Sequence, residues 1–477
     1  MNDNTKKHYG IHRKDPRFIE NNETNSFLAK YNSGSLKIHD WNKLAMFVTE
    51  IFNEVKNDNN GNVADYIPQL ANVNENLFTL ALVSVDGQVI ELGDTTTTFS
   101  IQSCSKPITY GIALDNYGDN FVHNFVGKEP SGRNFNNMCL NEDLLPHNPL
   151  INAGAIMTTS LIEKEDKQAD RFDFAINYWN NLTANTYMGF SNSIYLSEKD
   201  TADRNYCLGY MMQEQGTFLN GKDKSVSTSH NRTWDHSDLV KNLELYFQFC
   251  SLETKILGAG LIAATLANGG IQPWTNQKVF KYSTVKSVLS IMFACGMYDY
   301  SGEWGYSIGI PAKSGVSGLI YGVIPGVCGI AIYSPKLDKI GNSYRGIQFF
   351  KKFSEKFNVH IFDNLCDKNK INIVQKDYYD KRALGFFLLN ACKNNDISTI
   401  QEVLSKGCDI NFKDYDNRTS LHIACAEEHV ETIEFLLENN VKITEDRWNN
   451  LPLDEIKTPE IKEKIAILIH KNSELSE

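Results

Sequence analysis

Strand-forming segments lie on both sides of a long helical region, and this order constrains the fold more than any other feature. Residues 77–83 form a short apolar run, Asp86-Gly87 is typical of a hairpin turn, and residues 88–91 form the return run. Another strand ends near Phe99. Residues 108–300 then show mainly helical periodicity with long connections, including an Ala- and Gly-rich core helix over residues 256–266.

Strand character returns over residues 301–335, beginning near Trp304. Residues 314–335 carry no charge and are long enough to cross a bilayer, but glycines and Pro325-Gly326 interrupt them. This pattern favours two buried strands joined by a turn over a membrane span. The sequence therefore predicts one sheet assembled from distant segments, with a helical subdomain inserted between them.

Charge and cysteine spacing exclude several classes of function. The 477 residues include 47 Lys and Arg against 58 Asp and Glu, a net charge of −11 that argues against a dedicated nucleic-acid binder. The ten cysteines include no CxxC pair, which removes the usual zinc and dithiol signatures. The N-terminal residues have no apolar segment typical of a secretory signal, and acidic residues argue against a mitochondrial presequence. We therefore expect a cytoplasmic protein with free thiols.

The C-terminal part contains an internal repeat. Ala391-Cys392 and Ala424-Cys425 are 33 residues apart, and residues 418–424 match the ankyrin pattern T-P-L-H-x-A closely. A degenerate copy follows at residues 450–453, which predicts two ankyrin repeats and a capping unit. The expected organisation is a flexible arm (1–25), a main domain (26–366), a linker (367–382) and ankyrin repeats (383–475), with residues 219–238 as a surface loop within the main domain.

Two short motifs carry the chemistry. Ser103-Cys104-Ser105-Lys106 is an S-x-x-K motif at the junction of a strand and a helix, where residues three apart share one face. A neutral lysine can take the proton of the serine hydroxyl and make it a nucleophile. Lys313-Ser314-Gly315 matches the K-[ST]-G strand that accompanies S-x-x-K in penicillin-binding proteins and class A β-lactamases. Read alone, Ser103 is more often a helix N-cap; the ordered pair of motifs favours the catalytic interpretation.

Longer segments carry a resemblance to a known family. They are residues 66–71, 102–107, 126–132, 147–155, Ser197-Glu198, residues 203–205, residues 295–299 and residues 311–318. Together they resemble the serine-dependent glutaminases, in particular the ankyrin-bearing animal type. The resemblance covers about residues 27–366 and continues into the repeats.

The resemblance implies a mixed α/β fold, with a β-lactamase-like antiparallel sheet flanked by helices and a helical subdomain, followed by all-α ankyrin repeats. It implies hydrolysis of L-glutamine to L-glutamate and ammonia through a glutamyl ester. The implied catalytic residues are Ser103, Lys106, Tyr66 and Tyr298, with backbone N–H groups of Ser103 and Val316 as the oxyanion hole. Glu198 suits the substrate ammonium, and Asn152, Asn205 and Tyr246 suit its carboxylate.

The resemblance also implies a homodimer or homotetramer, a protein partner for the ankyrin repeats, no nucleic acid or membrane, and no metal or cofactor, with phosphate as an activator. A mitochondrial address is the family alternative to the cytoplasm. Residues 133–140, which correspond to a family segment for assembly and activation, differ here at Cys139. Two other functions stay open. One is a penicillin-binding or β-lactamase-like serine hydrolase; the other is an inactive scaffold that presents ankyrin repeats.

Overall fold

The computed structural model describes residues 36–38, 40–132, 138–163, 167–218, 236–363, 370–374 and 381–474. The chain divides into two compact units, residues 1–374 and 375–477, which are treated separately below. The boundary falls within the predicted linker, residues 367–382. The predicted N-terminal arm, residues 1–25, lies outside the described residues, and so do residues 133–137 of the predicted assembly segment.

The larger unit is built on a five-stranded antiparallel sheet with the order β2-β1-β8-β7-β6. Strands β1 and β8 pair with Leu80 opposite Ile332, so the N-terminal hairpin joins the strands near the end of the unit. A second, three-stranded sheet has the order β3-β5-β4. The strands are β1 Thr79–Ser84, β2 Val89–Gly93, β3 Phe99–Ser100, β4 Met188–Phe190, β5 Leu252–Thr254, β6 Ala312–Ser314, β7 Leu319–Ile324 and β8 Cys328–Tyr333.

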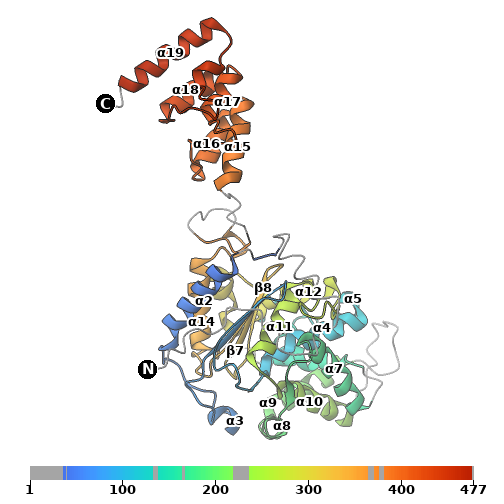
Figure 1. Cartoon of the computed structure of the whole chain (residues 1–477). Helices are drawn as coiled ribbons and strands as arrows, with labels where there is room; N and C mark the ends of the chain where they lie inside the picture. The colour runs from blue at the N-terminus through green and yellow to red at the C-terminus, as the bar shows by residue number, and fades with distance from the viewer. Residues whose placement is uncertain are drawn as a thin grey trace, which may run out of the picture. The chain divides into compact units, whose positions relative to one another are not determined.

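The large sheet lies between two layers of helices (Figure 1), and alternating side chains of its strands pack on each layer. Leu80 and Leu82 of β1 pack in one core with α2 (Trp41–Lys56) and α14 (Tyr344–Lys356). Ala81 and Val83 point to the opposite face, against α11 (Ile256–Ala267). This two-residue alternation is the expected geometry of a strand buried on both faces.

Helix α11 approaches the sheet very closely because both surfaces are made of small residues. A Cβ atom added at Gly329 of β8 would lie 2.3 Å from the backbone nitrogen of Ala264. A Cβ added at Gly260 of α11 would lie 3.0 Å from the Cβ of Ala81. The Ala- and Gly-rich run that predicts a core helix is thus confirmed as the helix that covers the centre of the sheet.

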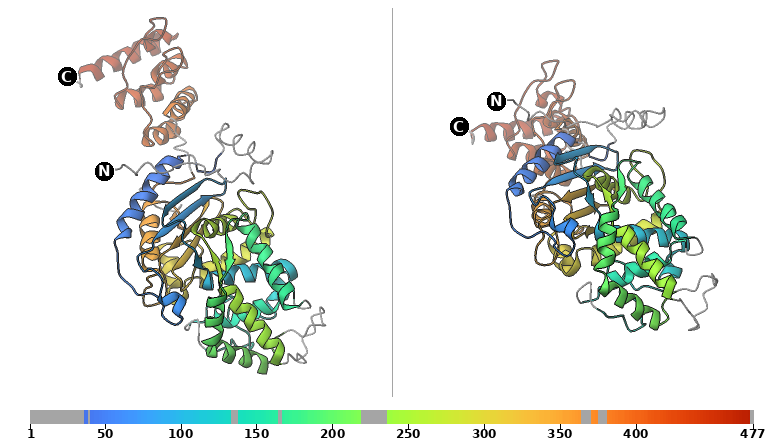
Figure 2. Two further views of the ribbon diagram at one scale, coloured as in Figure 1. Left: turned by 60° about the horizontal axis from the view of Figure 1, so that its bottom comes forward. Right: turned by 90° about the horizontal axis from the view of Figure 1, so that it is seen from below.

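The remaining helices of the larger unit form the predicted helical subdomain and its connections to the sheet; Figure 2 shows them beside the sheet from two further directions. They are α3 Pro68–Ala71, α4 Lys106–Tyr117, α5 Asp119–Val122, α6 Asn152–Ser160, α7 Gln168–Leu182, α8 Asn192–Asp200, α9 Asp203–Glu214, α10 His236–Cys250, α12 Tyr282–Cys295 and α13 Ser301–Ser307, with 3₁₀ turns η2 Gln102–Ser105 and η3 Tyr298–Tyr300.

The sequence places some boundaries wrongly. Trp304 lies in helix α13, not at the start of a strand; its buried ring packs beside Phe350, and its Nε1 donates to the carbonyl of Ile310 at 2.7 Å. Strand structure begins only at Ala312. Residues 236–238 belong to helix α10, whereas residues 219–235 of the predicted surface loop lie outside the described part of the chain. The two strands and turn predicted between residues 314 and 335 are confirmed as β7 and β8.

The smaller unit stacks short helices around its own apolar core. Its elements are α15 Lys381–Lys393, α16 Ile397–Ser405, α17 Ser420–Ala426, α18 Val430–Glu438, η5 Pro452–Glu455 and α19 Pro459–Glu474. Leu388, Ile400, Leu421 and Ile433 are buried together in this core. Two helix pairs, followed by the 3₁₀ turn η5 and helix α19, form the array that the 33-residue spacing predicts.

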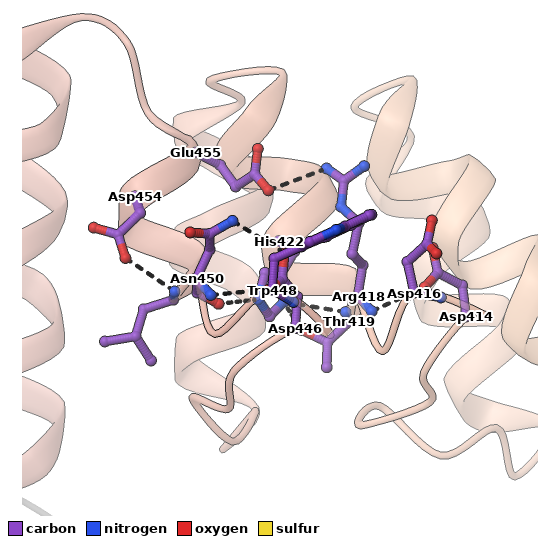
Figure 3. Close-up of polar contacts among 11 residues, drawn as sticks. Asp414, Asp416, Arg418, Thr419, His422, Asp446, Trp448, Asn450, Asp454 and Glu455 are labelled. Atoms are coloured by element: carbon purple, nitrogen blue, oxygen red, sulfur yellow. Dashed lines mark hydrogen bonds and ion pairs between the residues drawn. The ribbon is translucent and has the colours of Figure 1, made fainter.

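Two equivalent loops of the smaller unit are held by the same aspartate geometry (Figure 3). Asp414 accepts the backbone N–H groups of Asp416 and Arg418, each at 2.8 Å. Asp446 accepts those of Trp448 and Asn450 at 2.8 and 2.9 Å. In each loop, one aspartate carboxylate accepts hydrogen bonds from two partly buried backbone N–H groups and fixes the turn, as in an Asx turn.

His422, the histidine of the ankyrin pattern, joins two neighbouring repeats through its ring nitrogens. Its Nδ1 lies 3.1 Å from the backbone nitrogen of Thr419, which donates to it, so the ring proton is on Nε2. Nε2 then donates to the carbonyl of Asn450 at 3.2 Å (Figure 3). The histidine therefore ties the start of α17 to the loop of the next repeat, and burial lowers its pKa.

Candidate active site

The S-x-x-K motif occupies the junction between β3 and α4. Ser103 lies in the 3₁₀ turn η2, and Lys106 is the first residue of α4. Side chains three residues apart eclipse one another in a 3₁₀ turn, so Ser103 and Lys106 share one side of the junction. Gln102, immediately before the serine, has the left-handed value φ 52°. A non-glycine residue in this region stores strain of the kind that is concentrated at functional sites.

The amine of Lys106 is fully enclosed. The residue is 1% exposed, and its Nζ donates to Oδ1 of Asn152, the first residue of α6, at 2.6 Å. Nδ2 of Asn152 donates in turn to Oδ1 of Asn205 in α9 at 3.1 Å. Burial lowers the pKa of Lys106 to about 8, while Cys250 and Glu198 oppose this shift. A sizeable neutral fraction near pH 7–8 makes this amine able to accept a proton.

Tyr298 reaches the serine from a strained turn. It begins η3 with φ 55°, and its side chain forms a hydrogen bond with Ser103 that opposes the rise in the pKa of Tyr298 caused by burial. The preceding Gly296 allows this turn to lie directly on β6, because a Cβ at Gly296 would be only 1.7 Å from the carbonyl oxygen of Ala312. Any larger residue would push the tyrosine turn away from the strand.

Lys313 holds the tyrosine turn to β6. Its buried Nζ donates to the carbonyls of Gly296 at 3.1 Å and Ser314 at 2.6 Å, and lies 4.4 Å from the centre of the Tyr298 ring. Burial, and then the positive charge of Lys106, lowers the pKa of Lys313 to about 7. Lys313, the lysine of the K-S-G motif, therefore contacts the Tyr298 ring and the end of β6. The sequence alone does not predict these contacts.

We expect Lys313→Met to lower the turnover of the proposed substrate by about 10–100-fold, because small displacements of catalytic groups have effects of this size. The neutral methionine avoids the cost of burying an amine, so the melting temperature should stay within a few degrees of the parent value. Steady-state kinetics and thermal unfolding of this variant, with the exposed Lys352→Met as control, check this. Unchanged turnover in Lys313→Met would show that the hydrogen bonds from Lys313 to Gly296 and Ser314 are not needed for catalysis.

The K-S-G strand packs directly on the serine turn. Sγ of Cys104 lies 3.4 Å from the carbonyl oxygen of Lys313, and a Cβ at Gly315 would lie 2.9 Å from the carbonyl oxygen of Ile101. The hydroxyl of Tyr321 in β7 donates to the carbonyl of Cys104 at 3.2 Å. Val316 follows the strand and packs beside Ile67, next to Tyr66 in the chain. The two motifs, far apart in sequence, are thus joined into one structure.

A buried carboxylate lies on the same site. The hydroxyl of Tyr66 donates to Oε1 of Glu198 in α8 at 2.6 Å and lies 3.3 Å from Oε1 of Gln102. Tyr66 is 44% exposed as a whole residue, although burial around its hydroxyl raises its pKa well above the usual value. Burial raises the pKa of Glu198, while the Tyr66 and Gln102 side chains and the charge of Lys106 lower it. Glu198 is therefore a nearly buried acidic group beside the serine–lysine pair.

Comparisons with known proteins decide the family. Residues 61–362 match the family model described as Glutaminase, and residues 358–455 match the model described as Ankyrin repeats (3 copies). The chain belongs to the glutaminase family. It is 42% identical to the mouse protein named glutaminase liver isoform, mitochondrial, over 88% of this chain and 67% of the relative. It is also 42% identical to putative glutaminase 3 of Caenorhabditis elegans, over 88% of this chain and 70% of that one.

Solved glutaminase structures share the fold of the larger unit. The probable glutaminase ybaS superposes with a TM-score of 0.61 and 33% identity, over 67% of this chain and 98% of that one. Mglu in its tris and glutamate form superposes with a TM-score of 0.59 and 32% identity, over 67% of each chain. The predicted fold class, a mixed α/β unit with an antiparallel sheet plus all-α ankyrin repeats, is confirmed.

All nine residues that the sequence proposes for this glutaminase site come from segments that meet around Ser103. Tyr246 of α10 is buried, and burial followed by Cys250 and Glu198 raises its pKa. The structure adds two residues that the sequence does not single out as site residues, Gln102 and Cys250. Burial raises the pKa of the Cys250 thiol to about 12, which keeps it protonated and unsuited to act as a nucleophile.

The described part of the glutaminase chain has no group of three or more histidine, cysteine or acidic side chains arranged to hold a metal ion. Among the helices of that part, none is both long enough and apolar enough to cross a bilayer. The nine cysteines within the described ranges are free.

Proposed function

We propose that this chain hydrolyses L-glutamine to L-glutamate and ammonia, with Ser103 as nucleophile and Lys106 as its base. The observation that carries the proposal is the enclosed amine of Lys106, whose pKa is lowered to about 8, on the same side of the junction as Ser103. The amine of Lys106 donates one N–H hydrogen bond to Asn152, so the nitrogen lone pair of the neutral amine is free to face another group. A base with a pKa near the working pH is the efficient choice for activating a hydroxyl.

The proposed reaction has two halves. Lys106 takes the proton from Ser103 as Oγ attacks the side-chain amide carbon of glutamine. The C–N bond breaks, the proton passes to the leaving nitrogen, and ammonia departs to leave a glutamyl ester on Ser103. Water then attacks the ester carbonyl and gives a proton to Lys106. As the C–O bond to Ser103 breaks and releases glutamate, Lys106 returns that proton to Oγ of Ser103. Tyr298 is hydrogen-bonded to Ser103 and relays the proton between the Ser103 hydroxyl and the Lys106 amine.

The negative charge that develops on the substrate oxygen needs nearby donors. We propose the backbone N–H groups of Ser103 and Val316, which belong to the two segments that pack against each other through Cys104 and Lys313. Such donors stabilise charge that exists only in the transition state, and the loss of one typically lowers kcat by about 10²–10³.

The buried polar side chains account for the choice of a free amino acid as substrate. Glu198 is the acidic partner for the α-ammonium, with Tyr66 orienting its carboxylate. Asn152 is already engaged by Lys106 and Asn205, so its main contribution is to orient the base. The Nδ2 of Asn205 is then the donor left for the α-carboxylate. The hydroxyl of Tyr246, which is hydrogen-bonded to Cys250, would turn from the thiol to serve as a second donor.

The test is to incubate the purified full chain with L-glutamine and to measure ammonia and L-glutamate separately. We expect equal amounts of the two products, no ammonia from L-asparagine at a comparable rate, and no covalent adduct with penicillin. A penicillin adduct without ammonia release would support the β-lactamase-like alternative, and neither activity would support the inactive scaffold. The proposed mechanism takes every proton from side chains and water, so no metal or cofactor is required. Phosphate as an activator is checked by adding it to the same assay.

We also propose a homodimer or homotetramer and a protein partner for the smaller unit. Tyr415 is 92% exposed and Trp448 57% exposed on the two loops fixed by Asp414 and Asp446. Large aromatic side chains on rigid loops are typical anchors in protein interfaces. Light scattering of the full chain that shows only monomer would contradict the oligomer. Loss of a partner in Trp448→Ala, with glutaminase activity unchanged, would support the loop surface.

The cytoplasm is the proposed location, since the free thiols suit a reducing compartment. Microscopy of the tagged full-length protein distinguishes this from the mitochondrial address that the names of the mammalian relatives carry.

A further inference from the structure

A second cavity lies away from the serine, between helices α4 and α12. It has a volume of about 460 Å³ and is also bordered by the start of α5. Figure 1 shows these three helices lying together in the larger unit. Leu114 of α4 and Ile291 of α12 are the aliphatic residues of its lining, to which Tyr110 adds an aromatic ring. None of the residues proposed for glutamine hydrolysis lines it.

Three cationic side chains belong to the lining of this cavity. Lys128, Lys281 and Lys286 line it, against one carboxylate, Asp119. The whole chain has a net charge of −11, so the lysine-rich lining of this cavity has the opposite sign of charge to the chain. Asp119 is already engaged, because it accepts from Lys128 at 3.2 Å and from Ser287 at 3.1 Å. Lys286 has no ion pair with another described residue, so its charge is available to a ligand.

Two of the three lysines have an acidic neighbour: Asp119 pairs with Lys128, and Oδ1 of Asp115 accepts the backbone N–H of Lys281 at 3.0 Å. Lys281 donates through Nζ to the backbone carbonyl of Asp115 at 2.7 Å, and the Asp115 carboxylate accepts from the hydroxyl of Thr284 at 2.7 Å. His123 donates through Nδ1 to the carbonyl of Val126 at 2.8 Å and accepts the Tyr110 hydroxyl on Nε2 at 2.8 Å. His123 and Tyr110 are thus hydrogen-bonded members of the lining that add no positive charge. Hydroxyls of Ser283 and Ser290 add further donors.

We propose that this cavity binds a small organic dianion. Its acidic groups would lie against Lys281, Lys286 and Lys128, and its carbon body would cover Leu114 and Ile291. The volume is in the range of small-molecule sites, about 300–1,000 Å³, and exceeds what a bare inorganic anion fills. The apolar residues of the lining likewise favour a ligand with a carbon skeleton. Dicarboxylates and phosphorylated small molecules share this chemistry, and the experiment separates them.

The position of the cavity connects a ligand to the candidate active site. Helix α4 begins at Lys106, and α12 ends at Cys295, directly before the turn that carries Tyr298. A ligand that fills the space between the two helices therefore contacts the elements that position the base and the tyrosine. This coupling rests on the proposed function, whereas the binding itself does not.

The experiment measures binding to the full chain by calorimetry, and variants of the cavity lysines separate binding here from binding at the candidate active site. The probes are glutarate, glycerol 3-phosphate and inorganic phosphate. We expect saturable binding of at least one organic probe, tighter than inorganic phosphate. The double variant K281Q/K286Q should bind it at least about 10-fold more weakly, since each lost charge-assisted bond contributes on this scale. K278Q, a change at an exposed lysine that does not line the cavity, should bind it as the parent does.

Each outcome decides the proposal. No saturable binding of either organic probe, equal affinity in K281Q/K286Q and K278Q, or tightest binding of inorganic phosphate would overturn it. Preference for glutarate over glycerol 3-phosphate, or the reverse, identifies the acidic group. Glutamine turnover measured without probes should be the same in both lysine variants and the parent. If the chain binds the probe but hydrolyses no glutamine, the cavity proposal stands and the proposed function fails.

Discussion

Ser103→Ala should abolish glutamine hydrolysis almost completely, lowering kcat by about 10⁴–10⁶. Alanine has no group that can form the glutamyl ester, so the reaction loses its covalent path and keeps only the binding pocket and the oxyanion donors. Because Ser103 is half-buried and the substitution removes a single oxygen, the fold should be retained. Ammonia release under saturating glutamine measures the effect, and the circular dichroism melting curve checks the fold.

The control for this variant is Ser307→Ala, at a serine in α13 whose hydroxyl donates to the helix carbonyl of Glu303. It should keep the parent rate. Parent-like ammonia release from Ser103→Ala would mean that another group carries the reaction, and the proposed mechanism would be wrong.

Replacing Lys106 should have the second largest effect. Lys106→Met removes the base, and Lys106→Arg keeps a cation that does not lose its proton at any working pH. We expect both to lower kcat by about 10³–10⁴, the upper range for loss of a general base acting with its nucleophile. The arginine variant is the sharper test, because a role that needed only positive charge would survive it.

The pH dependence of the parent enzyme follows from the same residue. Burial lowers the pKa of Lys106 to about 8, so the neutral, basic form gains population as the pH rises. We expect kcat/KM to increase about tenfold per pH unit below pH 8 and to level off above it. The unfolded lysine, with a pKa of about 10.4, binds more protons than the folded one between about pH 8 and 10, so this residue adds stability as the pH rises through that window. A flat profile between pH 6 and 8 would contradict the assignment.

The sequence predicts the parts of this protein that are set by local patterns. The S-x-x-K motif follows a strand and begins a helix, and the glycine-punctuated run around Pro325 forms the two central strands. The 33-residue spacing predicts the repeats of the smaller unit, because each repeat is a local helical pair that stacks on its neighbour.

The parts that the sequence does not predict depend on contacts between distant segments. The left-handed backbone of Gln102, the tether from Lys313 to Gly296 and the place of Cys250 in the site each need another segment to define them. Trp304 illustrates the opposite error. An aromatic residue in an apolar segment favours a strand locally, but here its indole is buried beside Phe350 in the middle of a short helix. Tertiary packing outweighs local preference at such positions.

The central claim, that Ser103 carries the glutamyl group during turnover, can be tested by quenching the reaction in acid and mapping the enzyme by mass spectrometry. The account predicts that, within the first turnovers at saturating glutamine, a glutamyl group appears on the peptide containing Ser103, and that it is absent from Ser103→Ala. A glutamyl group on any other residue, or full ammonia release from the parent enzyme with no acylated Ser103 at any quench time, would contradict it.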